Sequence, residues 1–302
     1  MVRKFAGSRR VRAAVFGLAG ILIGGAALAC PVPEARDLED GWVLDPRDAA
    51  PTVRPGAAAI DAWAGLVARL RNDGKVLVVL VPPPRGAVAP GLAEAERTGL
   101  RHTYRETLDA MRATGAIAVD LLPAADRSVA FHFRADPHWT TEGALESAIS
   151  LADATGRRGV RPADLRLSRS GASMSLTGAM GGCGAGPRRE DTPIYVLPDV
   201  VPPRAGPRIA LVGTSFVDLH RRDYLRVQPA IRAATGAEVD LHAHGSDPFR
   251  AMARYLLSPR SDEGRHDLVV WVLPPWTDFD AGGRLDALVG TVAMAAGREP
   301  NL

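Results

Sequence analysis

Short apolar runs that end at turn residues recur along this chain, and they constrain its fold more than any other feature. Lys75–Val81 reads KVLVVLV before three prolines, and Asp267–Leu273 reads DLVVWVL before two more. Continuous apolar runs of this length are typical of strands that are buried on both faces of a parallel sheet. The predicted strands are Lys75–Val81, Ala116–Leu122, Arg208–Val212, Ala237–Leu241 and Asp267–Leu273.

Segments with apolar residues at helical spacing separate these strands. In Ala58–Asn72 the apolar side chains recur every three or four residues until Gly74 ends the pattern. The predicted helices are Ala58–Asn72, Leu92–Thr114, Thr141–Thr155, Tyr224–Thr235, Asp247–Leu257 and Arg284–Ala296, and the segment 156–206, rich in Arg, Gly, Ser and Pro, is predicted to be irregular. Alternating strands and helices predict a three-layer α/β/α fold with a mostly parallel central sheet.

The first 29 residues have the pattern of an export signal. Basic residues precede an apolar run of 17 residues from Ala13 to Ala29, which ends in a small-x-small cleavage pattern before Cys30. A run of 17 is at the lower limit for a membrane span, so an uncleaved anchor is the alternative to cleavage. We expect a signal peptide or signal anchor at 1–29, an extended N-terminal arm at 30–57 and one domain at 58–302.

The charge of the chain gives no indication of a nucleic-acid surface. The formal net charge is +3, but residues 1–29 hold five basic residues and no acidic one. The remaining chain, with 32 basic and 34 acidic residues, has a formal charge of −2. Nucleic-acid binding needs clustered basic charge on the folded part, so we expect no nucleic-acid partner.

The chain has only two cysteines, Cys30 and Cys183. If the protein is exported, they enter an oxidising compartment in which they can pair only with each other within one chain. The predicted disulfide would fix the mature N-terminus to the domain. Two buried thiols, or a lipid on Cys30, are the alternatives.

Ser215 follows a predicted strand in the sequence Leu211–Phe216. In open parallel sheets, ligands bind at the carboxyl ends of the strands. Gly213 permits a tight turn there, which would expose Ser215 as a nucleophile near backbone amides that can hold an oxyanion. The alternative is that Ser215 caps the following helix, which is a common role of serine.

Asp136 and His138 lie two residues apart in the segment Ala135–Thr141. In an extended segment, side chains at this spacing point the same way. Asp136 can then hold the imidazole while His138 acts as a base. The alternatives are a polar loop beside a buried Trp139, or a metal site, for which two donors are few.

The segment after the fourth predicted strand, Ala243–Pro248, contains Gly245. This glycine is a candidate to bring a backbone N–H group to the same sheet edge. His242 and His244 form an H-x-H pattern, which by itself is weak evidence for a metal site, and we expect no metal.

Two of these segments resemble blocks of a known family. Asp136–Gly143, DPHWTTEG, is similar to the D-x-H-W-[ST]-x-x-G block of the alginate O-acetyltransferase family of the AlgX/AlgJ type. Gly213–Phe216 resembles the nucleophile block of that family, and the strands at 75–81 and 268–274 match two further family strands. The resemblance covers most of residues 58–280 and implies an SGNH-hydrolase-like fold. In this family Asp-x-His precedes the serine, which reverses the usual order.

The resemblance implies a catalytic triad in which Ser215 is the nucleophile, His138 the general base and Asp136 its orienting residue. It implies transfer of acetyl groups to hydroxyls of an exopolysaccharide such as alginate, without a cofactor. The implied partners are a membrane-bound O-acyltransferase that supplies acetyl groups and other exopolysaccharide export proteins, and the implied location is the periplasm, with an inner-membrane anchor if the N-terminal segment is uncleaved. The chain departs from the family pattern where Val272 and Pro275 replace the frequent acidic residue and arginine.

Candidate substrate-binding groups surround the predicted triad. The backbone N–H groups of Ser215 and Gly245 are candidates for the oxyanion hole, and Trp139 and Thr140 lie next to His138 in sequence. An arginine can bind a uronate carboxylate through two hydrogen bonds. The candidates for this role are Arg85, Arg134, Arg221 and Arg250, and those for stacking on sugar rings are Trp139, Trp271 and Trp276, with core packing as the alternative for the first two tryptophans.

Three other functions fit the same residues. A periplasmic carbohydrate acetylesterase would use the same triad and release acetate to water. A non-catalytic glycan-binding scaffold of an export complex would need no nucleophile at Ser215. A structural α/β protein would have no site at all.

Overall fold

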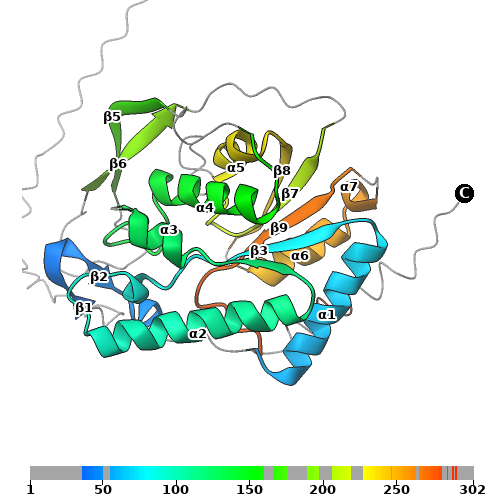
Figure 1. Cartoon of the computed structure of the whole chain (residues 1–302), viewed down its shortest axis with the longest axis horizontal. Helices are drawn as coiled ribbons and strands as arrows, with labels where there is room; N and C mark the ends of the chain where they lie inside the picture. The colour runs from blue at the N-terminus through cyan, green and yellow to red at the C-terminus, as the bar shows by residue number, and fades with distance from the viewer. Residues whose placement is uncertain are drawn as a thin grey trace, which may run out of the picture.

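Five strands form the central sheet of the molecule, in the order β4-β3-β9-β7-β8 (Figure 1). Every neighbouring pair is parallel. The strands are β3 (Val76–Leu80), β4 (Ile117–Val119), β7 (Arg208–Gly213), β8 (Glu238–Ala243) and β9 (Leu268–Val272). The predicted α/β fold with a parallel central sheet is confirmed.

This computed structural model describes most of the chain between Arg36 and Asp280. The described residues are 36–49, 55–128, 130–159, 166–175, 189–196, 206–218, 227–245, 247–262, 265–280, 284, 288 and 290. The predictions for the export signal, Cys30, Cys183 and Arg221 lie outside them, as does most of the predicted helix at 284–296. Among the described residues, no helix has the length and apolar character needed to cross a membrane.

Helices cover both faces of the sheet because each strand alternates its side chains between two apolar cores. Leu77 and Val79 of β3 belong to one core, whereas Val78 and Leu80 belong to the other. The first core packs against α1 (Ala57–Asn72), α2 (Glu94–Ala113) and α6 (Pro248–Leu256). The second packs against α3 (Leu122–Arg127), α4 (Thr141–Ala154) and α5 (Val227–Thr235), and the short α7 (Pro259–Asp262) follows α6 (Figure 1).

Trp271 of β9 lies at the centre of the first core. Its ring stacks on the ring of Trp63 with 4.8 Å between centroids and 8° between planes. Its indole N–H donates to the carbonyl oxygen of Pro248 at 3.2 Å. A fully buried ring with its polar atom satisfied is a packing residue. Core packing, the alternative to sugar stacking, is therefore the role of Trp271.

Several segments differ from the sequence predictions. The segment 156–206 contains an antiparallel pair, β5 (Arg166–Ser175) and β6 (Arg189–Val196), where irregular structure was expected. These strands carry many polar residues, so apolar periodicity could not reveal them. The predicted strand Ala116–Leu122 is also too long, because Leu122 begins α3 and Pro123 occupies the first turn of that helix, where proline is tolerated.

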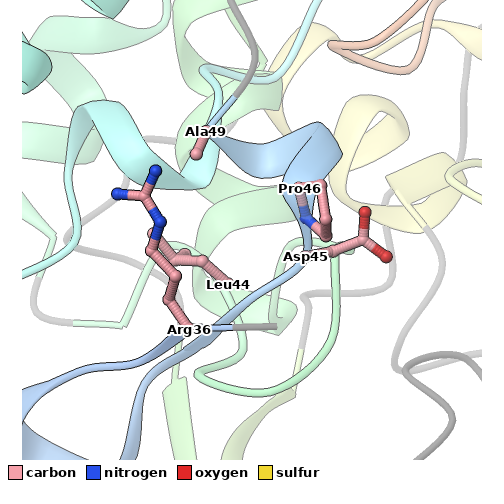
Figure 2. A pocket seen from close by; sticks show the side chains of 5 residues that line it. All are labelled: Arg36, Leu44, Asp45, Pro46 and Ala49. Carbon is pink, nitrogen blue, oxygen red and sulfur yellow. The ribbon is translucent and has the colours of Figure 1, made fainter. Parts of the chain in front are cut away.

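Residues 36–49, hereafter the arm, pack on the domain. The arm contains a short antiparallel pair, β1 (Arg36–Asp37) and β2 (Val43–Leu44), and the 3₁₀ turns η1 (Glu39–Gly41) and η2 (Pro46–Asp48). It is therefore more structured than the extended segment expected there. The Val43 N–H donates to the carbonyl oxygen of Arg134 at 2.8 Å, which joins the arm to the loop before α4. A cavity of about 340 Å³ on the arm is lined by Arg36, Leu44, Asp45, Pro46 and Ala49 (Figure 2).

Candidate active site

Ser215 lies in a tight turn directly after β7. Thr214 and Phe216 on either side are buried, whereas Ser215 is exposed. The Val217 N–H donates to the carbonyl oxygen of Thr214 at 3.0 Å and closes the turn around Ser215. Gly213 is needed for close packing, because a Cβ there would lie 2.9 Å from a methyl carbon of Val217. Within the described residues 206–218, this turn is what positions Ser215.

Asp136 and His138 lie at the tip of the loop 131–140, hereafter the His138 loop, which connects α3 to α4. Backbone hydrogen bonds join the two sides of this loop. The Thr140 N–H donates to Phe131 O at 3.0 Å, and the Phe133 N–H donates to His138 O at 3.2 Å. Every residue of the loop is buried except Arg134. These hydrogen bonds and the burial of its side chains hold the loop in place.

Ser215, His138 and Asp136 form one chain of hydrogen bonds. The Nε2 atom of His138 lies 2.8 Å from Ser215 Oγ, and its Nδ1 atom lies 2.6 Å from Asp136 Oδ1. The His138 backbone N–H also donates to Asp136 Oδ1, at 2.9 Å. A hydroxyl, an imidazole and a carboxylate in this order can generate a nucleophile by proton transfer to the imidazole.

The surroundings of Asp136 favour its ionised form. Burial raises the pKa of this carboxyl, which is only 2 % exposed, but hydrogen bonds from the ring and backbone of His138 and the positive charge of Arg85 outweigh burial. The net effect is a pKa below the usual value for aspartate. A carboxylate that stays ionised can fix the ring orientation of His138 and stabilise its protonated form.

Phe216 forms an apolar wall beside His138, and sequence reasoning missed it. The two ring centroids lie 4.6 Å apart. Behind Phe216, Trp139 packs edge-to-face at 5.6 Å, and the half-buried Trp276 lies at 5.8 Å. The guanidinium of Arg47 lies over the Trp276 ring at 5.0 Å. An apolar residue next to the serine was the only sequence signal for this wall.

Two predicted substrate-binding residues are buried, and their side chains make hydrogen bonds within the fold. Trp139 is fully buried, and its indole N–H donates to the carbonyl oxygen of Phe216 at 3.1 Å. Thr140 is also buried; its hydroxyl accepts from the Gly143 N–H at 3.1 Å and donates to the carbonyl oxygen of Ala130. Trp139 thus supports the wall and Thr140 caps α4, and neither side chain is presented to a ligand.

Gly245 and Arg250 are both exposed near the end of β8. β7 pairs with β8 as far as Gly213 and Ala243, and the His244 N–H donates to Gly213 O at 2.9 Å. The segment that contains Gly245 therefore begins beside the strand that leads to Ser215. Gly245 has a φ of 42°, which favours glycine. Arg250 lies in the first turn of α6.

The sequence prediction for Arg85 was wrong. It was considered as a ligand for a uronate carboxylate, but it is fully buried and engaged by Asp48 and by backbone carbonyl groups. It therefore has no access to a substrate. Arg134 is exposed, and its Nη1 donates to the carbonyl oxygen of Asp40 at 2.9 Å.

The first histidine of the H-x-H pattern at the end of β8, His242, belongs to an aromatic cluster. The ring of His242 lies 5.0 Å from Tyr255 and 5.9 Å from His266, centroid to centroid. Within the described part of the chain, no three His, Cys, Asp or Glu side chains are grouped so as to hold a metal ion.

Comparison with known families gives one match that spans most of the chain. The model of the SGNH hydrolase-like domain of the acetyltransferase AlgX matches residues 39–179 and 199–275. Among curated proteins, the alginate biosynthesis protein AlgX of Azotobacter vinelandii is 26% identical over 236 residues. That alignment covers 69% of this chain and 47% of the relative, so the chain spans about half the length of the curated protein it matches.

Solved structures show the same fold. Pseudomonas aeruginosa AlgX superimposes with a TM-score of 0.72 at 20% identity, over 89% of this chain and 69% of that protein. The O-acetyltransferase domain of Pseudomonas putida AlgJ superimposes with a TM-score of 0.59 at 20% identity, over 86% of this chain and all of that domain.

Proposed function

Because the chain belongs to the family of SGNH hydrolase-like domains of the acetyltransferase AlgX, we propose that it is an exported O-acetyltransferase. It transfers acetyl groups, through an acyl-enzyme on Ser215, to hydroxyls of an exopolysaccharide such as alginate. The observation that carries this proposal is the hydrogen-bonded chain from exposed Ser215 through His138 to buried Asp136.

The first half-reaction acylates the serine. Ser215 Oγ attacks the acetyl carbonyl carbon, and its proton moves to Nε2 of His138 as the new C–O bond forms. The donor's leaving group then departs with that proton, which leaves an acetyl ester on Ser215. Asp136 holds the imidazole and stabilises its transient positive charge.

The second half-reaction repeats these steps with a sugar hydroxyl as the nucleophile. His138 accepts the hydroxyl proton, the sugar oxygen attacks the acetyl carbonyl, and the proton returns to Ser215 Oγ as the ester bond to the serine breaks. In both halves a negative charge develops on the carbonyl oxygen. The backbone N–H groups of Ser215 and Gly245 are the proposed donors to it, a contribution of about 3–4 kcal/mol for each donor.

The polysaccharide acceptor is proposed to lie over the carboxyl edge of the sheet. Trp276 is half-buried beside Phe216, which makes it the best-placed tryptophan for stacking on a sugar ring. Exposed Arg250 at the start of α6 is the proposed ligand for a uronate carboxylate. The proposed context is the periplasm, with a membrane-bound O-acyltransferase as the acetyl supplier and other exopolysaccharide export proteins as partners. The export pattern of residues 1–29 supports this location, and the same segment provides an inner-membrane anchor if it is not cleaved.

An acetylesterase is the second candidate, because Ser215 is exposed and water can reach an acyl-enzyme there. The two functions are separated by an assay with an acetylated donor and an oligosaccharide acceptor. A transferase yields acetylated sugar, whereas an esterase yields only acetate.

Replacement of the nucleophile tests the proposal itself. Ser215→Ala removes the attacking oxygen and is expected to abolish acetyl transfer. Ser258→Ala is the matched control, because Ser258 follows α6 at its far end and its hydroxyl bonds locally. It donates to Tyr255 O at 2.7 Å and accepts from the Ser261 N–H at 3.3 Å. The control should keep wild-type transfer. Transfer that persists in Ser215→Ala would reject the proposed nucleophile.

A further inference from the structure

We propose that Arg85 is a positioning residue, which fixes the His138 loop so that Asp136 and His138 face Ser215. The inference rests on the proposed function of that site. It assigns a role to a buried ion pair between Arg85 and Asp48, far apart in sequence and outside the triad.

Arg85 uses its whole guanidinium group inside the protein. It is 0% exposed, and its Nε donates to Phe133 O at 3.1 Å. Its Nη1 donates to Val43 O at 2.9 Å and to Asp48 Oδ2 at 2.7 Å, and its Nη2 donates to Arg134 O. One side chain thus joins two consecutive carbonyl groups of the His138 loop to the arm.

Asp48 neutralises this buried charge and is itself held in place. Its Oδ2 also accepts a hydrogen bond from the Asp45 N–H at 2.9 Å, within the η2 turn. A buried charge without a partner is strongly destabilising, so the pair must form for the arm to pack here. The arm is therefore part of the support of the site.

The contacts of Arg85 lie directly beside the triad. Phe133 and Arg134 are the third and second residues before Asp136, and the Phe133 N–H donates to the carbonyl oxygen of His138 at 3.2 Å. Arg85 itself begins the turn η3 (Arg85–Ala87) after β3, at the same sheet edge where Ser215 follows β7. Arg85 thus ties the loop that carries the base to the sheet that carries the nucleophile.

Only a guanidinium can make these contacts together. Its planar fork has five N–H donors directed to different sides, whereas a lysine ammonium is a compact charge with three. Arg85→Lys keeps the charge opposite Asp48 but cannot reach both loop carbonyls and Val43. A misplacement of about 1 Å in a catalytic group can cost about 100-fold in rate. We expect the loop, and with it the imidazole, to shift in this variant.

The test compares Arg85→Lys and Arg85→Gln with a matched control, Lys75→Met. Lys75 is also buried and also donates to a backbone carbonyl, that of Ser261 at 2.7 Å, but it lies before β3, at the opposite edge of the sheet. Two readouts are measured on the full chain. One is the low-field proton NMR signal of the His138 Nδ1–H, which reports the bond to Asp136 without turnover. The other is the rate of Ser215 acylation by 4-nitrophenyl acetate, with thermal unfolding measured alongside.

Arg85→Lys is expected to stay folded, to lose or shift the low-field signal and to be acylated at least about 100-fold more slowly. Lys75→Met should lower the unfolding temperature but keep the signal and the rate. A wild-type signal and a wild-type rate in both Arg85 variants would overturn the inference. Failure of both variants to fold would also overturn it, because the ion pair would then serve the fold as a whole. If wild-type Ser215 is never acylated but the signal still depends on Arg85, the proposed function fails and the positioning role stands.

Discussion

At the scale of single residues, the orientation of His138 depends on Asp136 more than on any other side chain. Asp136 Oδ1 accepts from both the ring Nδ1–H and the backbone N–H of His138, at 2.6 and 2.9 Å. These bonds leave Nε2 as the free acceptor towards Ser215. The pKa of Asp136 below its usual value means that this arrangement persists into acidic solution.

Asp136→Asn should therefore cost far more activity than its small change in volume suggests. The amide cannot stabilise the imidazolium and favours the wrong tautomer of His138, so acylation of Ser215 should fall by about 10⁴-fold. The rate of 4-nitrophenol release from the acetate ester measures this. Asp126→Asn is the control, because Asp126 pairs with Arg101 on the surface. A rate for Asp136→Asn within tenfold of wild type would contradict the assigned role.

Single residues also show what sequence reasoning could and could not predict. Ser215, His138 and Asp136 could be predicted because their spacing and the resemblance to a family point to them, and the structure brings the three side chains together. The engagement of Arg85 could not be predicted. A chain rich in arginine gives no sign of which guanidinium is buried, since burial depends on contacts with residues about 40 to 50 positions away.

At the scale of elements, α4 is packed against the His138 loop without space for a side chain between them. A Cβ on Gly143, in the first turn of α4, would lie 2.0 Å from the carbonyl oxygen of Phe131 and 2.9 Å from Trp139 Cβ. Backbone atoms cannot move away as a flexible side chain can. This close approach is the physical reason for glycine at that position.

Gly143→Ala should therefore destabilise the protein even though alanine favours helices. We expect a loss of about 2–3 kcal/mol in the free energy of unfolding, measured by urea denaturation, from overpacking. Gly65→Ala in α1 is the matched control, because no atom lies within 4 Å of a Cβ built there. That variant should gain up to about 1 kcal/mol from helix propensity. Equal effects of the two substitutions would contradict the packing argument.

The sequence predicts best those strands whose residues are nearly all apolar and buried. Three of the five sheet strands, β3, β7 and β9, lie within a residue of their predicted bounds because nearly every residue of these runs is apolar. The bounds of β8 lie within two residues of the prediction, although apolar and polar residues alternate along it. The pair β5–β6 was missed because backbone hydrogen bonds between polar segments hold it, and polar segments leave no periodic apolar signal. The arm was expected to be extended because proline-rich composition does not reveal a long-range partner such as Arg85.

At the scale of the whole molecule, the site lies where strand order reverses. From β3 the chain moves outward to β4, and from β7 it moves outward to β8 on the other side, with β9 between them. Loops after β3 and β7 therefore diverge above β9, at the carboxyl edge of the sheet, which is where ligands bind in open α/β sheets. Ser215, Arg85 and Trp276 all follow the carboxyl ends of these central strands.

The stability of the whole molecule should depend on pH through His132 of the His138 loop. Burial and the charge of Arg85 lower the pKa of His132 to about 3. Because the folded state keeps this ring neutral, the unfolded state binds more protons between about pH 6.5 and pH 3. The contribution of neutral His132 to the free energy of unfolding is fully present above about pH 6.5. As the pH falls below about 6.5, this contribution is lost by up to about 1.4 kcal/mol per pH unit.

His132→Gln should flatten this dependence in urea denaturation curves recorded from pH 7 to pH 4. His102→Gln is the matched control, because the side chain of His102 is 73% exposed on α2. The control should keep the wild-type slope. Parallel curves for wild type and His132→Gln would show that the ring is not held neutral in the folded state.

The most direct test of the central claim is the intact mass of the protein, quenched shortly after mixing with an activated acetyl ester. The account predicts that the wild-type chain gains the mass of one acetyl group, that peptide mapping places it on Ser215, and that an added oligosaccharide removes it as acetylated sugar. Ser215→Ala should gain nothing under the same conditions. An unmodified wild-type chain, or an acetyl group that maps elsewhere and persists in Ser215→Ala, would contradict the account.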